Sequence, residues 1–590
     1  MIVTMKKVLI LGTQENKESL LQNLQEAGVV HIEPVTSEKM QHLHFKDELN
    51  LIEQALKALS VYKADGDSAA VTRPSIEVAR ETLRFQKERS ELQEQETVYR
   101  QQLATVQPWG EFSSELLAEL AHQGVAFRFW KCPITEMTKF ENVMIPWQKK
   151  EGKSAFLITL SYGKEIKSPE KAEEVFIPRG ANELKSEMAE IEEEMRAIDR
   201  ELRALSLYVP QLEKEVKKLS DQIAFEQARV ALLSQGEVFG LKGWVPRHKV
   251  EEIKKIGERI PIALEIEEAS KDDTPPTLIE NPRWIQSVLD IVKLYATPGY
   301  REWDTSLPLY FAFAIFFAMI VGDGGYGLVL LSIMLYFRGK LMKSEAGARV
   351  FRLMTTLSVG CILYGLLSGS WFSIPREVIE KSPLWFLSAM PTWLKFDTSD
   401  TNFMMTLAVY IGAVHLSLAR LIQAARLWWS WSVLPELGWI VAIWGGIARI
   451  VWQNPEGLYI LAAGAAIVFL FSSTSRNPLM RILDGALALL GVTQNFADIL
   501  SYLRLFALGL ASAMLATVFN KLGLDVHHAI PGFLGYVLMV LILFAGHTIN
   551  LGLSIMGGFI HGLRLNFLEF YRYCFEGTGY DYKPFLKIEG

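Results

Sequence analysis

Cysteine is scarce in this sequence of 590 residues, which contains only Cys132, Cys361 and Cys574. Because the three lie far apart in the chain, they predict neither a disulfide framework nor a metal cluster. The apolar run within the opening residues MIVTMKKVLILGTQ is too short for a signal peptide. We therefore expect the N-terminal half of the chain to be cytoplasmic.

Nucleotide-binding loops are also lacking. The phosphate-binding pattern GxxxxGK[ST] is absent, and GxGxxG occurs once, as GDGGYG at 322–327. That copy lies inside an apolar stretch rather than between a strand and a helix, so it predicts a turn. We expect Asp323 to be a turn residue and not an ion site. The sequence predicts no catalytic site, cofactor, metal or nucleic acid partner for this chain.

Charged residues are scarce in the second half of the chain. Residues 1 to about 300 are charged and helix-prone, whereas residues 308–573 are mostly apolar. The net charge of −6 averages these two regimes and says little about partners. We therefore predict a cytoplasmic domain at 1–300 and an α-helical transmembrane domain at 301–590.

The cytoplasmic domain is predicted to begin and end with a strand–helix–strand unit. The expected elements are strand 8–11, helix 15–27 and strand 29–32, then strand 238–245, helix 247–259 and strand 262–266. Two such units form a ferredoxin-like α+β lobe. Here the lobe comprises 1–35 plus 236–268 and is interrupted by a long insertion.

The insertion carries a heptad pattern. Twelve apolar residues alternate at spacings of four and three, namely Leu184, Met188, Ile191, Met195, Ile198, Leu202, Leu205, Val209, Leu212, Val216, Leu219 and Ile223. This seam predicts an antiparallel coiled-coil stalk in which 181–235 packs against 38–105, with a kink at Pro210. A distal α/β lobe at 106–180, with strands at 125–130 and 155–160, would cap its far end. A long helical linker is the alternative.

Seven apolar stretches are long enough to be membrane spans: 308–337, 350–372, 403–426, 433–452, 457–473, 492–519 and 533–573. The first is broken by the glycines at 322–327. The loop that follows it, 338–352, carries five basic residues and should be cytoplasmic, as should the N-terminal domain.

The first stretch must then enter the membrane and return as a hairpin of two short arms. This predicts eight transmembrane helices with both termini cytoplasmic. Later basic residues also fall on the cytoplasmic side: Arg420, Arg426, Arg476, Arg481, Arg572, Lys583 and Lys587. The segments 373–402 and 522–531 are predicted to lie on the opposite side of the membrane from the cytoplasm.

The last two apolar stretches each carry an arginine. Arg504 lies near the middle of 492–519, where a permanent charge must face protein or water and meet a negative partner. On 533–573, polar or small residues recur at helical spacing and predict one polar face, formed by His547, Asn550, Ser554, Gly557, His561 and Arg564. A polar face inside a membrane is where water or ions can travel.

Five motifs occur in the order found in one known family: GLKGWVP at 240–246, TPGYREWDTS at 297–306, FFAMIVGDGGYG at 316–327, SYLRLFALGLA at 501–511 and GGFIHGLRLNFLEF at 557–570. The sequence resembles the membrane-embedded stator subunit of rotary V-type and A/V-type ATPases, which is called subunit I in bacteria and subunit a in eukaryotes. The resemblance implies eight membrane helices and a stalk-bearing cytoplasmic half.

The resemblance also implies partners. Arg504 and Arg564 would face the membrane ring of proteolipid subunits (c or K), whose glutamates carry H⁺ or Na⁺. Peripheral stalk subunits of E/G type would hold the cytoplasmic domain. A central-stalk subunit of d/C type would sit on the ring, and the V1/A1-type ATPase head would be coupled indirectly.

There are departures from the family pattern. Some relatives have His and Glu where this chain has Ser512 and Ser554, so their detailed relay cannot be transferred. The chain also lacks the long loops of eukaryotic members, which favours a multi-pass protein of a prokaryotic cell membrane. In the family, the choice between H⁺ and Na⁺ is made mainly by the ring subunit, and the direction of flux stays open.

A mechanism follows from the arginines. A ring carboxylate stays neutral in lipid and becomes ionised beside Arg504, which drives its ion off, while two offset half-channels carry ions to and from the ring. Arg564 would share this role or hold the second boundary. We expect Glu569, His561 and Asn566 to line the cytoplasmic half-channel. The outer half would be lined by His547, Asn550 and Ser554, and Ser512 and Asp498 are further candidates for the ion path.

Simpler interpretations stay open. His561 and His547 could hydrogen-bond within a helix pair, Asp498 could cap a helix or pair locally, and Arg504 could form a structural salt bridge. A secondary transporter with a buried arginine at its substrate site would show an internal repeat, and none is seen between 308–452 and 457–573. A membrane tether that conducts no ions would leave the polar face unexplained.

Overall fold

The computed structural model describes all residues except 34–43, 63–72, 114–116, 118, 120, 141–142, 163–168, 170, 178, 384–399, 474, 476 and 589–590. Arg476 and parts of the predicted segments 38–105, 106–180 and 373–402 therefore lie outside the described residues. The chain folds into two compact units. The first comprises Met1–Leu11, Val29–Glu33 and Leu241–Pro584, and the second Gly12–Gly28, Pro34–Gly240 and Phe585–Gly590. This division follows packing, whereas the predicted boundary at residue 300 follows composition.

One sheet combines strands from both ends of the predicted cytoplasmic domain. Its strands follow the order β2 (His31–Ile32), β8 (Val238–Pro246), β1 (Met5–Thr13), β9 (Ala263–Glu268), and β7 (Leu233–Gln235) also pairs with β8. Strands β1 and β9 are antiparallel, with Val8 opposite Ile266. Helix α1 (Lys17–Ala27) follows β1, and α7 (Val250–Arg259) follows β8. Since β8 lies between β1 and β2, the strand order is that of a split strand–helix–strand lobe.

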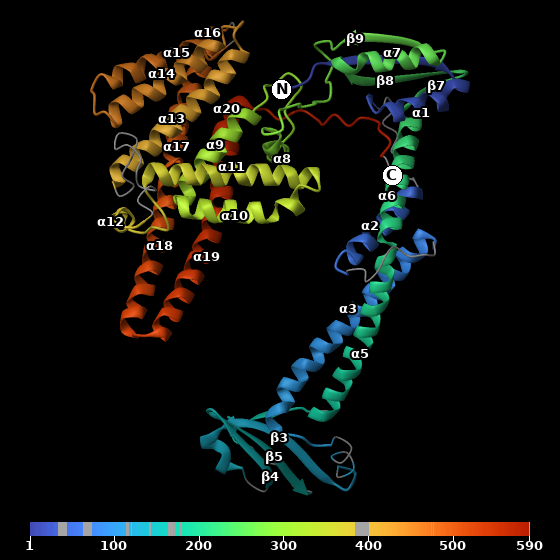
Figure 1. The fold of residues 1–590 in the computed structure, drawn as a ribbon, viewed down its shortest axis with the longest axis vertical. Coiled ribbons are helices and arrows are strands. Elements are labelled where there is room, and N and C mark those ends of the chain that lie inside the picture. The colour runs from blue at the N-terminus through green and yellow to red at the C-terminus, as the bar shows by residue number, and fades with distance from the viewer. Residues whose placement is uncertain are drawn as a thin grey trace. The chain divides into compact units, whose positions relative to one another are not determined.

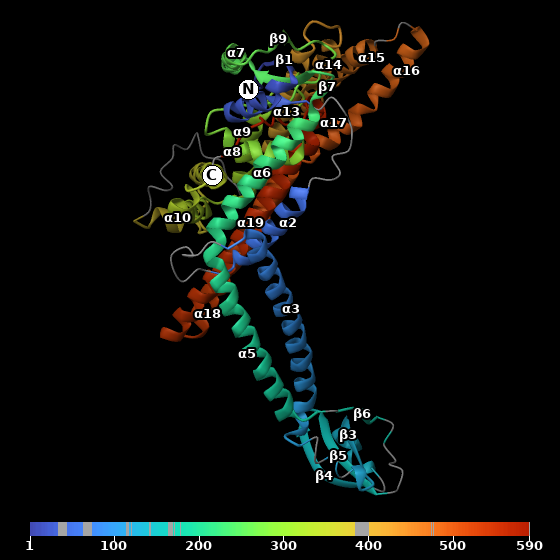
Figure 2. The same ribbon diagram turned by 90° about the vertical axis from the view of Figure 1, so that its right-hand side faces the viewer.

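The second unit contains a helical bundle. Its helices are α2 (His44–Leu59), α3 (Ser75–Val106), α5 (Ala181–Leu205) and α6 (Val209–Ala231), and both views show α3 beside α5 (Figures 1 and 2). They share a core formed by Ile52, Ala55, Leu59, Val78, Ala79, Leu202, Leu205, Leu212 and Leu219. A 3-10 turn, Ser206–Tyr208, separates α5 from α6, and Pro210 lies in the first turn of α6. The interruption predicted at Pro210 is therefore present, while the action of the bundle as a stalk stays a prediction.

A second sheet is formed by the residues between α3 and α5. Its antiparallel strands follow the order β4 (Met144–Glu151), β5 (Ser154–Tyr162), β3 (Val125–Pro133), β6 (Glu173–Val175). The side chain of Trp109 packs edge-on against Phe156, with 4.9 Å between ring centroids, and donates a hydrogen bond to the carbonyl of Leu157. Strands β3 and β5 lie where strands were expected, whereas β4 and β6 were not predicted.

The first unit contains the apolar helices. They are α9 (Ser306–Val321), α10 (Gly324–Leu341), α11 (Glu345–Ser368), α13 (Thr401–Arg426), α14 (Val433–Ile450), α15 (Gly457–Phe471), α16 (Pro478–Leu489), α17 (Gly491–Leu500), α18 (Leu503–Ala529) and α19 (Phe533–Arg564). Two shorter helices, α8 (Gln286–Tyr295) and α12 (Arg376–Glu380), lie outside this set.

Among the described residues, five helical segments are long and apolar enough to cross a membrane: 345–368, 401–426, 433–450, 478–529 and 533–574. Helices α9 and α10 pass the same test only together, and they are bent by 118° at the break between them. This chain is therefore a multi-pass membrane protein. A bend beyond a right angle fits a segment that turns back, but the count of eight spans stays a prediction.

The turn between α9 and α10 depends on Asp323. Its Oδ1 accepts hydrogen bonds from the backbone N–H groups of Gly325 (2.8 Å) and Tyr326 (3.2 Å), and its Oδ2 accepts one from the Ser370 hydroxyl (3.0 Å). Asp323 is thus the N-cap of α10. The glycine run also allows close packing, because a Cβ atom on Gly365 would lie 2.3 Å from the Cα atom of Gly324. These contacts support the prediction that GDGGYG forms a turn.

The segment after the last membrane helix returns to the first sheet. The Thr277 N–H donates to the Tyr580 carbonyl (2.8 Å), and the Tyr582 hydroxyl donates to the Val29 carbonyl (2.6 Å). The Lys583 N–H donates to Nδ1 of His31 at 3.0 Å. Burial lowers the pKa of His31 below its ordinary value, against a smaller opposing effect of its contact with the Lys583 carbonyl.

This pKa shift predicts that the hydrogen bond between Lys583 and His31 is lost at low pH. A neutral Nδ1 accepts the Lys583 N–H, so the bond stabilises the fold fully above about pH 6.5, the pKa of an unperturbed histidine. Its contribution is lost as the pH falls from there through the lowered pKa of folded His31. We expect hydrogen-exchange protection of the Lys583 amide, corrected for intrinsic exchange, to be lower at pH 5.5 than at pH 7.5.

The Tyr582 amide is the comparison within the same segment, since it donates to the Thr277 carbonyl and not to His31, so it should lose less protection than the Lys583 amide. A His31→Asn variant keeps an acceptor but cannot take up a proton, so its Lys583 protection should not depend on pH. Equal wild-type protection at both pH values would contradict the prediction.

Candidate functional site

Helices α18 and α19 form a long pair that lies side by side (Figure 1), and α9 packs against both. Small residues allow this approach: a Cβ atom on Gly558 would lie 2.6 Å from the Phe317 ring, and one on Gly546 would lie 2.2 Å from the Phe519 ring. Gly509 likewise faces the carbonyl of Met319. Close backbone packing at small residues is the usual means of association between membrane helices.

Arg504 lies in the first turn of α18 and pairs with Glu569. Its Nη2 donates to Glu569 Oε1 at 2.8 Å, and its Nε donates to the Ser501 carbonyl at 2.9 Å. The Glu569 side chain is only 5% exposed and that of Arg504 is 25% exposed. Nη1 of Arg504 and Oε2 of Glu569 are also buried, and neither bonds to any described residue. The pair is thus anchored on one side, and on the other each partner keeps one buried polar atom that no described residue satisfies.

Glu569 reaches Arg504 from a wider helical turn. Residues Leu565–Phe570 form a π-helix directly after Arg564, and α20 (Tyr571–Cys574) follows. The wider turn slows the rotation of successive side chains about the helix axis and so redirects those that follow Arg564. Single π turns inside α-helices are found frequently at functional sites.

The other polar residues near the C-terminal end of α19 have polar atoms that lack hydrogen-bond or ion-pair partners among the described residues. Arg564 is exposed and forms no ion pair with the part of the chain that the structure describes. Nδ1 of His561 is buried without a hydrogen-bond partner there. Asn566 donates from Nδ2 to the Gly562 carbonyl at 2.8 Å, but its buried Oδ1 accepts no bond from any described residue.

Asp498 forms a separate cluster and does not contact Arg504. It accepts bonds from Gln494 Nε2 (2.7 Å), from Arg572 Nη1 (3.3 and 3.4 Å) and from the Tyr573 hydroxyl. The local pairing expected for Asp498 is present through Gln494. Its partners on α20, more than 70 residues away in sequence, were not expected.

The same region contains a buried ion pair that sequence reasoning missed. Arg420 of α13 donates to Glu436 of α14 at 2.8 Å and to Asn495 at 3.3 Å, and its guanidinium carbon lies 3.9 Å from the centre of the Tyr573 ring. Arg420 had been assigned only to the cytoplasmic basic residues. Arg420 lies within the apolar stretch 403–426, where a charge needs a partner, and this position could have predicted a buried ion pair.

A continuous hydrogen-bonded network lies further along α18 and α19. The Ser512 and Ser554 hydroxyls are 2.9 Å apart, and Asn550 donates both to the Ser512 carbonyl and to the Tyr326 hydroxyl, each at 2.9 Å. From there the chain of bonds continues through His547, which is 2.8 Å from the Tyr326 hydroxyl and 3.0 Å from Asn520. Sequence reasoning had singled out four of these residues but neither Tyr326 nor Asn520.

The six residues predicted to share one face of α19 do not share one environment. Asn550 and Ser554 are buried, whereas Arg564 is exposed. A strict seven-residue repeat drifts by about 20° per heptad on a straight helix. Over two heptads the polar face therefore rotates away from the neighbouring helices, which helps to place the two ends of the stripe in different surroundings.

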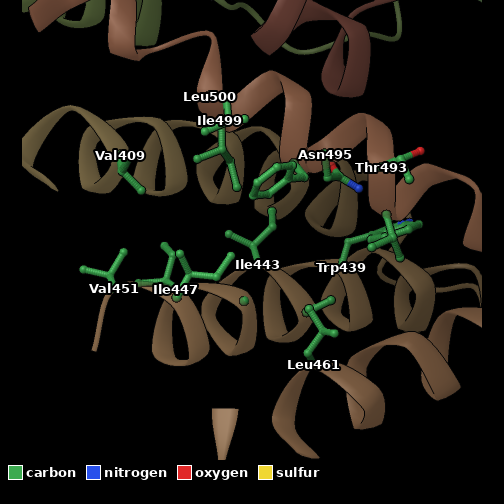
Figure 3. Close-up of a pocket in the computed structure, with 15 residues that line it drawn as sticks. Val409, Trp439, Ile443, Ile447, Val451, Leu461, Thr493, Asn495, Ile499 and Leu500 are labelled. Carbon is green, nitrogen blue, oxygen red and sulfur yellow. The ribbon is translucent and has the colours of Figure 1, made fainter. Parts of the chain in front are cut away.

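An apolar cavity of about 420 Å³ opens between α13, α14, α15 and α17. Figure 3 shows its lining, which is apolar apart from Thr493 and Asn495. An unpaired ion would be costly in such surroundings. No group of three or more acidic, histidine or cysteine side chains suited to a metal ion is found in the described ranges. The polar residues around Arg504 and Asn550 are therefore the better candidate site.

Comparison with known proteins places this chain in a family. A family model described as the V-type ATPase 116kDa subunit family matches residues 165–370 and 490–586, just over half of the chain. The chain belongs to the V-type ATPase 116 kDa subunit family. Both arginine-bearing helices, α18 and α19, lie within the second matched segment.

Relatives match over longer stretches than the family model. A V-type ATP synthase subunit I from Chlamydia pneumoniae is 28% identical over 672 residues, covering 100% of this chain and 97% of the relative. An A-type ATP synthase subunit I from Methanocaldococcus jannaschii is 26% identical over 414 residues, 63% of this chain and 59% of that protein.

A crystal structure of the cytoplasmic N-terminal domain of subunit I, homolog of subunit a, of V-ATPase, is 16% identical. The match covers 44% of this chain and 99% of the solved chain, with a TM-score of 0.22. A TM-score this low supports no conclusion about the fold of the present chain.

Proposed function

We propose that this chain is the membrane stator subunit of a rotary V/A-type ATPase and that it couples ion translocation to rotation of a proteolipid ring. The observation that carries the proposal is the geometry of α18 and α19. One end of the pair holds a partly buried arginine, with one guanidinium nitrogen that bonds to no described residue, and an exposed arginine, and the pair continues into a polar network. The relatives that match the whole chain are named as V-type ATP synthase subunit I.

Arg504 is built to receive a second carboxylate. Glu569 and the Ser501 carbonyl accept from Nη2 and Nε, which holds the guanidinium in one orientation, and the side chain stays 25% exposed. A ring carboxylate that arrives in its neutral form becomes stabilised as an anion beside this fixed positive charge, so that it releases H⁺ or Na⁺. Arg564, exposed on the adjacent helix, would hold the second boundary between the two ion paths.

Two half-channels then carry ions to and from the ring. In the proposal, Glu569, His561 and Asn566 line the cytoplasmic half, and His547, Asn550, Ser554 and Ser512 line the outer half. The buried polar atoms of His561, Asn566 and Glu569 that lack protein partners support a hydrated path at one end. The bonded network from Ser512 to Asn520 supports a polar path at the other.

The rest of the assembly would surround this chain. Beside the ring, we propose peripheral stalk subunits on the cytoplasmic bundle, a central-stalk subunit on the ring and an ATP-hydrolysing head. ATP hydrolysis would take place in that head and not in this chain. The rival functions are a secondary transporter and a tether that conducts no ions, and both predict no ATP-driven ion movement through this subunit.

Replacement of Arg564 tests the proposal. Liposomes that hold the whole co-purified complex should take up ions when ATP is added, and Arg564→Gln should reduce this uptake at least tenfold, because one boundary loses its charge. Arg449→Gln is the matched control, since Arg449 is exposed on α14 and pairs with no described acidic residue. Uptake should be read alongside subunit stoichiometry.

Two results would count against this function. Uptake that does not depend on ATP and that the purified chain performs alone would favour a transporter. Undiminished ATP-driven uptake in the Arg564→Gln complex would remove Arg564 from the ion path.

A further inference from the structure

Helix α8 is held against the start of the apolar helices. Its buried face belongs to the same core as residues of α9 and α11, a set that includes Ile285, Val288, Val292, Leu309 and Leu353. Trp284, which precedes α8, packs edge-on against Tyr310 and Phe311 of α9, with centroid distances of 5.2 and 6.2 Å. Helix α8 therefore lies at the level where the first apolar helix begins, close to α9 and α11 (Figure 1).

A polar pocket of about 470 Å³ separates α8 from the first two turns of α11. Its charged lining comprises four basic and two acidic side chains, namely Arg283, Lys293, Arg349, Arg352, Asp290 and Glu345. Two of the basic groups are neutralised by acids: Arg349 Nε donates to Asp290 at 2.6 Å, and Lys293 lies 3.1 Å from Asp581. The positive charge that remains belongs to Arg283 and Arg352.

Arg283 and Arg352 lie together at one end of this pocket. Nη1 of Arg352 donates to the Arg283 carbonyl at 3.3 Å, and neither side chain forms an ion pair with another residue of the described ranges. Because Arg352 meets Arg283 while Arg349 meets Asp290, α8 and α11 run antiparallel here. Glu345 therefore lies toward the opposite end, and the Arg283 end keeps its excess positive charge.

Exposed apolar surface begins directly beside these two arginines. Trp284 is 45% exposed, and Leu307, Phe311 and Ile315 follow on α9 at a spacing of four residues, each 41–53% exposed. A site for a soluble anion needs only positive charge. A positive site that continues into an apolar stripe with an aromatic residue at the junction matches a lipid, whose headgroup is anionic and whose chains are apolar.

We propose that this pocket binds the phosphate headgroup of an anionic phospholipid of the cytoplasmic leaflet. Arg283 and Arg352 contact the phosphate through charge-assisted hydrogen bonds, which planar guanidinium groups form well. The acyl chains lie along Trp284, Phe311 and Ile315. The lipid ties the junction between the cytoplasmic domain and the membrane helices to the bilayer surface. The inference rests on the proposed function only in placing α8 on the cytoplasmic side.

The test measures lipid binding to the whole complex in detergent. Native mass spectrometry would follow titration with phosphatidylglycerol or phosphatidylcholine. The pocket variant is Arg283→Gln with Arg352→Gln, and the control is Lys340→Gln with Lys343→Gln, which removes the same charge from exposed positions outside the pocket. Affinity for phosphatidylglycerol should fall roughly thirtyfold in the pocket variant, since each basic residue near an anionic surface contributes about 1 kcal/mol.

In the control variant the affinity should stay close to that of the wild type, because neither lysine lines the pocket. Replacement of both arginines by lysine should give an intermediate loss, because the charge stays but the planar fork is removed. This conservative variant also separates a binding effect from a folding effect, as does subunit stoichiometry.

Three results would overturn the inference. Phosphatidylcholine bound as tightly as phosphatidylglycerol, or an equal loss in the control variant, would exclude a specific anionic headgroup site. Displacement of the lipid by millimolar inorganic phosphate would identify a site for a soluble anion. Cross-linking of the pocket to an acidic segment of another subunit, with no lipid adduct, would identify a protein contact. The proposed function is tested separately, by ATP-driven ion uptake in the Arg564→Gln complex.

Discussion

Arg504→Gln is expected to abolish ATP-driven ion uptake by liposomes that hold the intact complex, with a fall of more than about a hundredfold. Arg504 supplies the fixed positive charge that the proposed ion-release step needs, and a glutamine amide carries no charge. Glutamine cannot stabilise an arriving ring carboxylate as an anion, so ion release fails. Glu569, which is only 5% exposed, is left without its counter-charge at the same time.

A double variant separates these two effects. Arg504→Gln combined with Glu569→Gln removes both charges and relieves the unpaired carboxylate, so the stability of the complex should recover while uptake should not. Arg449→Gln again controls for the loss of an arginine from a membrane helix. If uptake returns in the double variant, Arg504 is a structural partner of Glu569, and the ion path must be sought at Arg564 alone.

Glu436→Gln is expected to lower the stability of the membrane domain by about 3–5 kcal/mol, since it leaves the charge of buried Arg420 uncompensated. Their side chains are 10% and 17% exposed, and the ion pair is 2.8 Å long. The measurement is unfolding of the full chain in detergent, followed by tryptophan fluorescence against temperature or denaturing detergent. The midpoint should fall clearly below that of the wild type.

Replacement of both partners should restore most of this loss. Arg420→Met with Glu436→Leu removes the two charges together, and a methionine can still pack against the Tyr573 ring that Arg420 covers. Glu192→Gln provides the matched change in an exposed pair with Arg196, where an effect below about 1 kcal/mol is expected. A midpoint as low in the double variant as in Glu436→Gln would mean that a lost hydrogen bond, and not an unpaired charge, causes the effect.

The apolar helices show how far local pattern predicts this fold. The stretches 403–426 and 433–452 correspond to α13 and α14 within a few residues, because long apolar runs and their polar flanks act over short distances. The hydrophobic pattern predicted fewer of the strands in the N-terminal part of the chain. Strands β4 and β6 of the distal sheet carry mostly exposed residues, so little alternation marked them.

The candidate site was only half visible in sequence. Arg504 and Glu569 were each singled out, but for different places in the ion path, and their contact joins residues 65 positions apart. Nothing local predicts it, because a π-helix redirects Glu569 and only packing of α18 on α19 brings the two together. The sequence likewise did not indicate a role for Tyr326, because its hydroxyl joins the polar network only through Asn550 and His547 of another helix.

By itself, the sequence determined the membrane character of the second half, the two arginine-bearing helices and the family. These depend on composition, on spacing along one helix and on motifs, all of which are local. Only the tertiary structure decided which charges meet: Arg504 with Glu569, Arg420 with Glu436, and Asp498 with Arg572. A buried charge is stable only beside its partner, and the packing of helices that are distant in sequence decides which partner it meets.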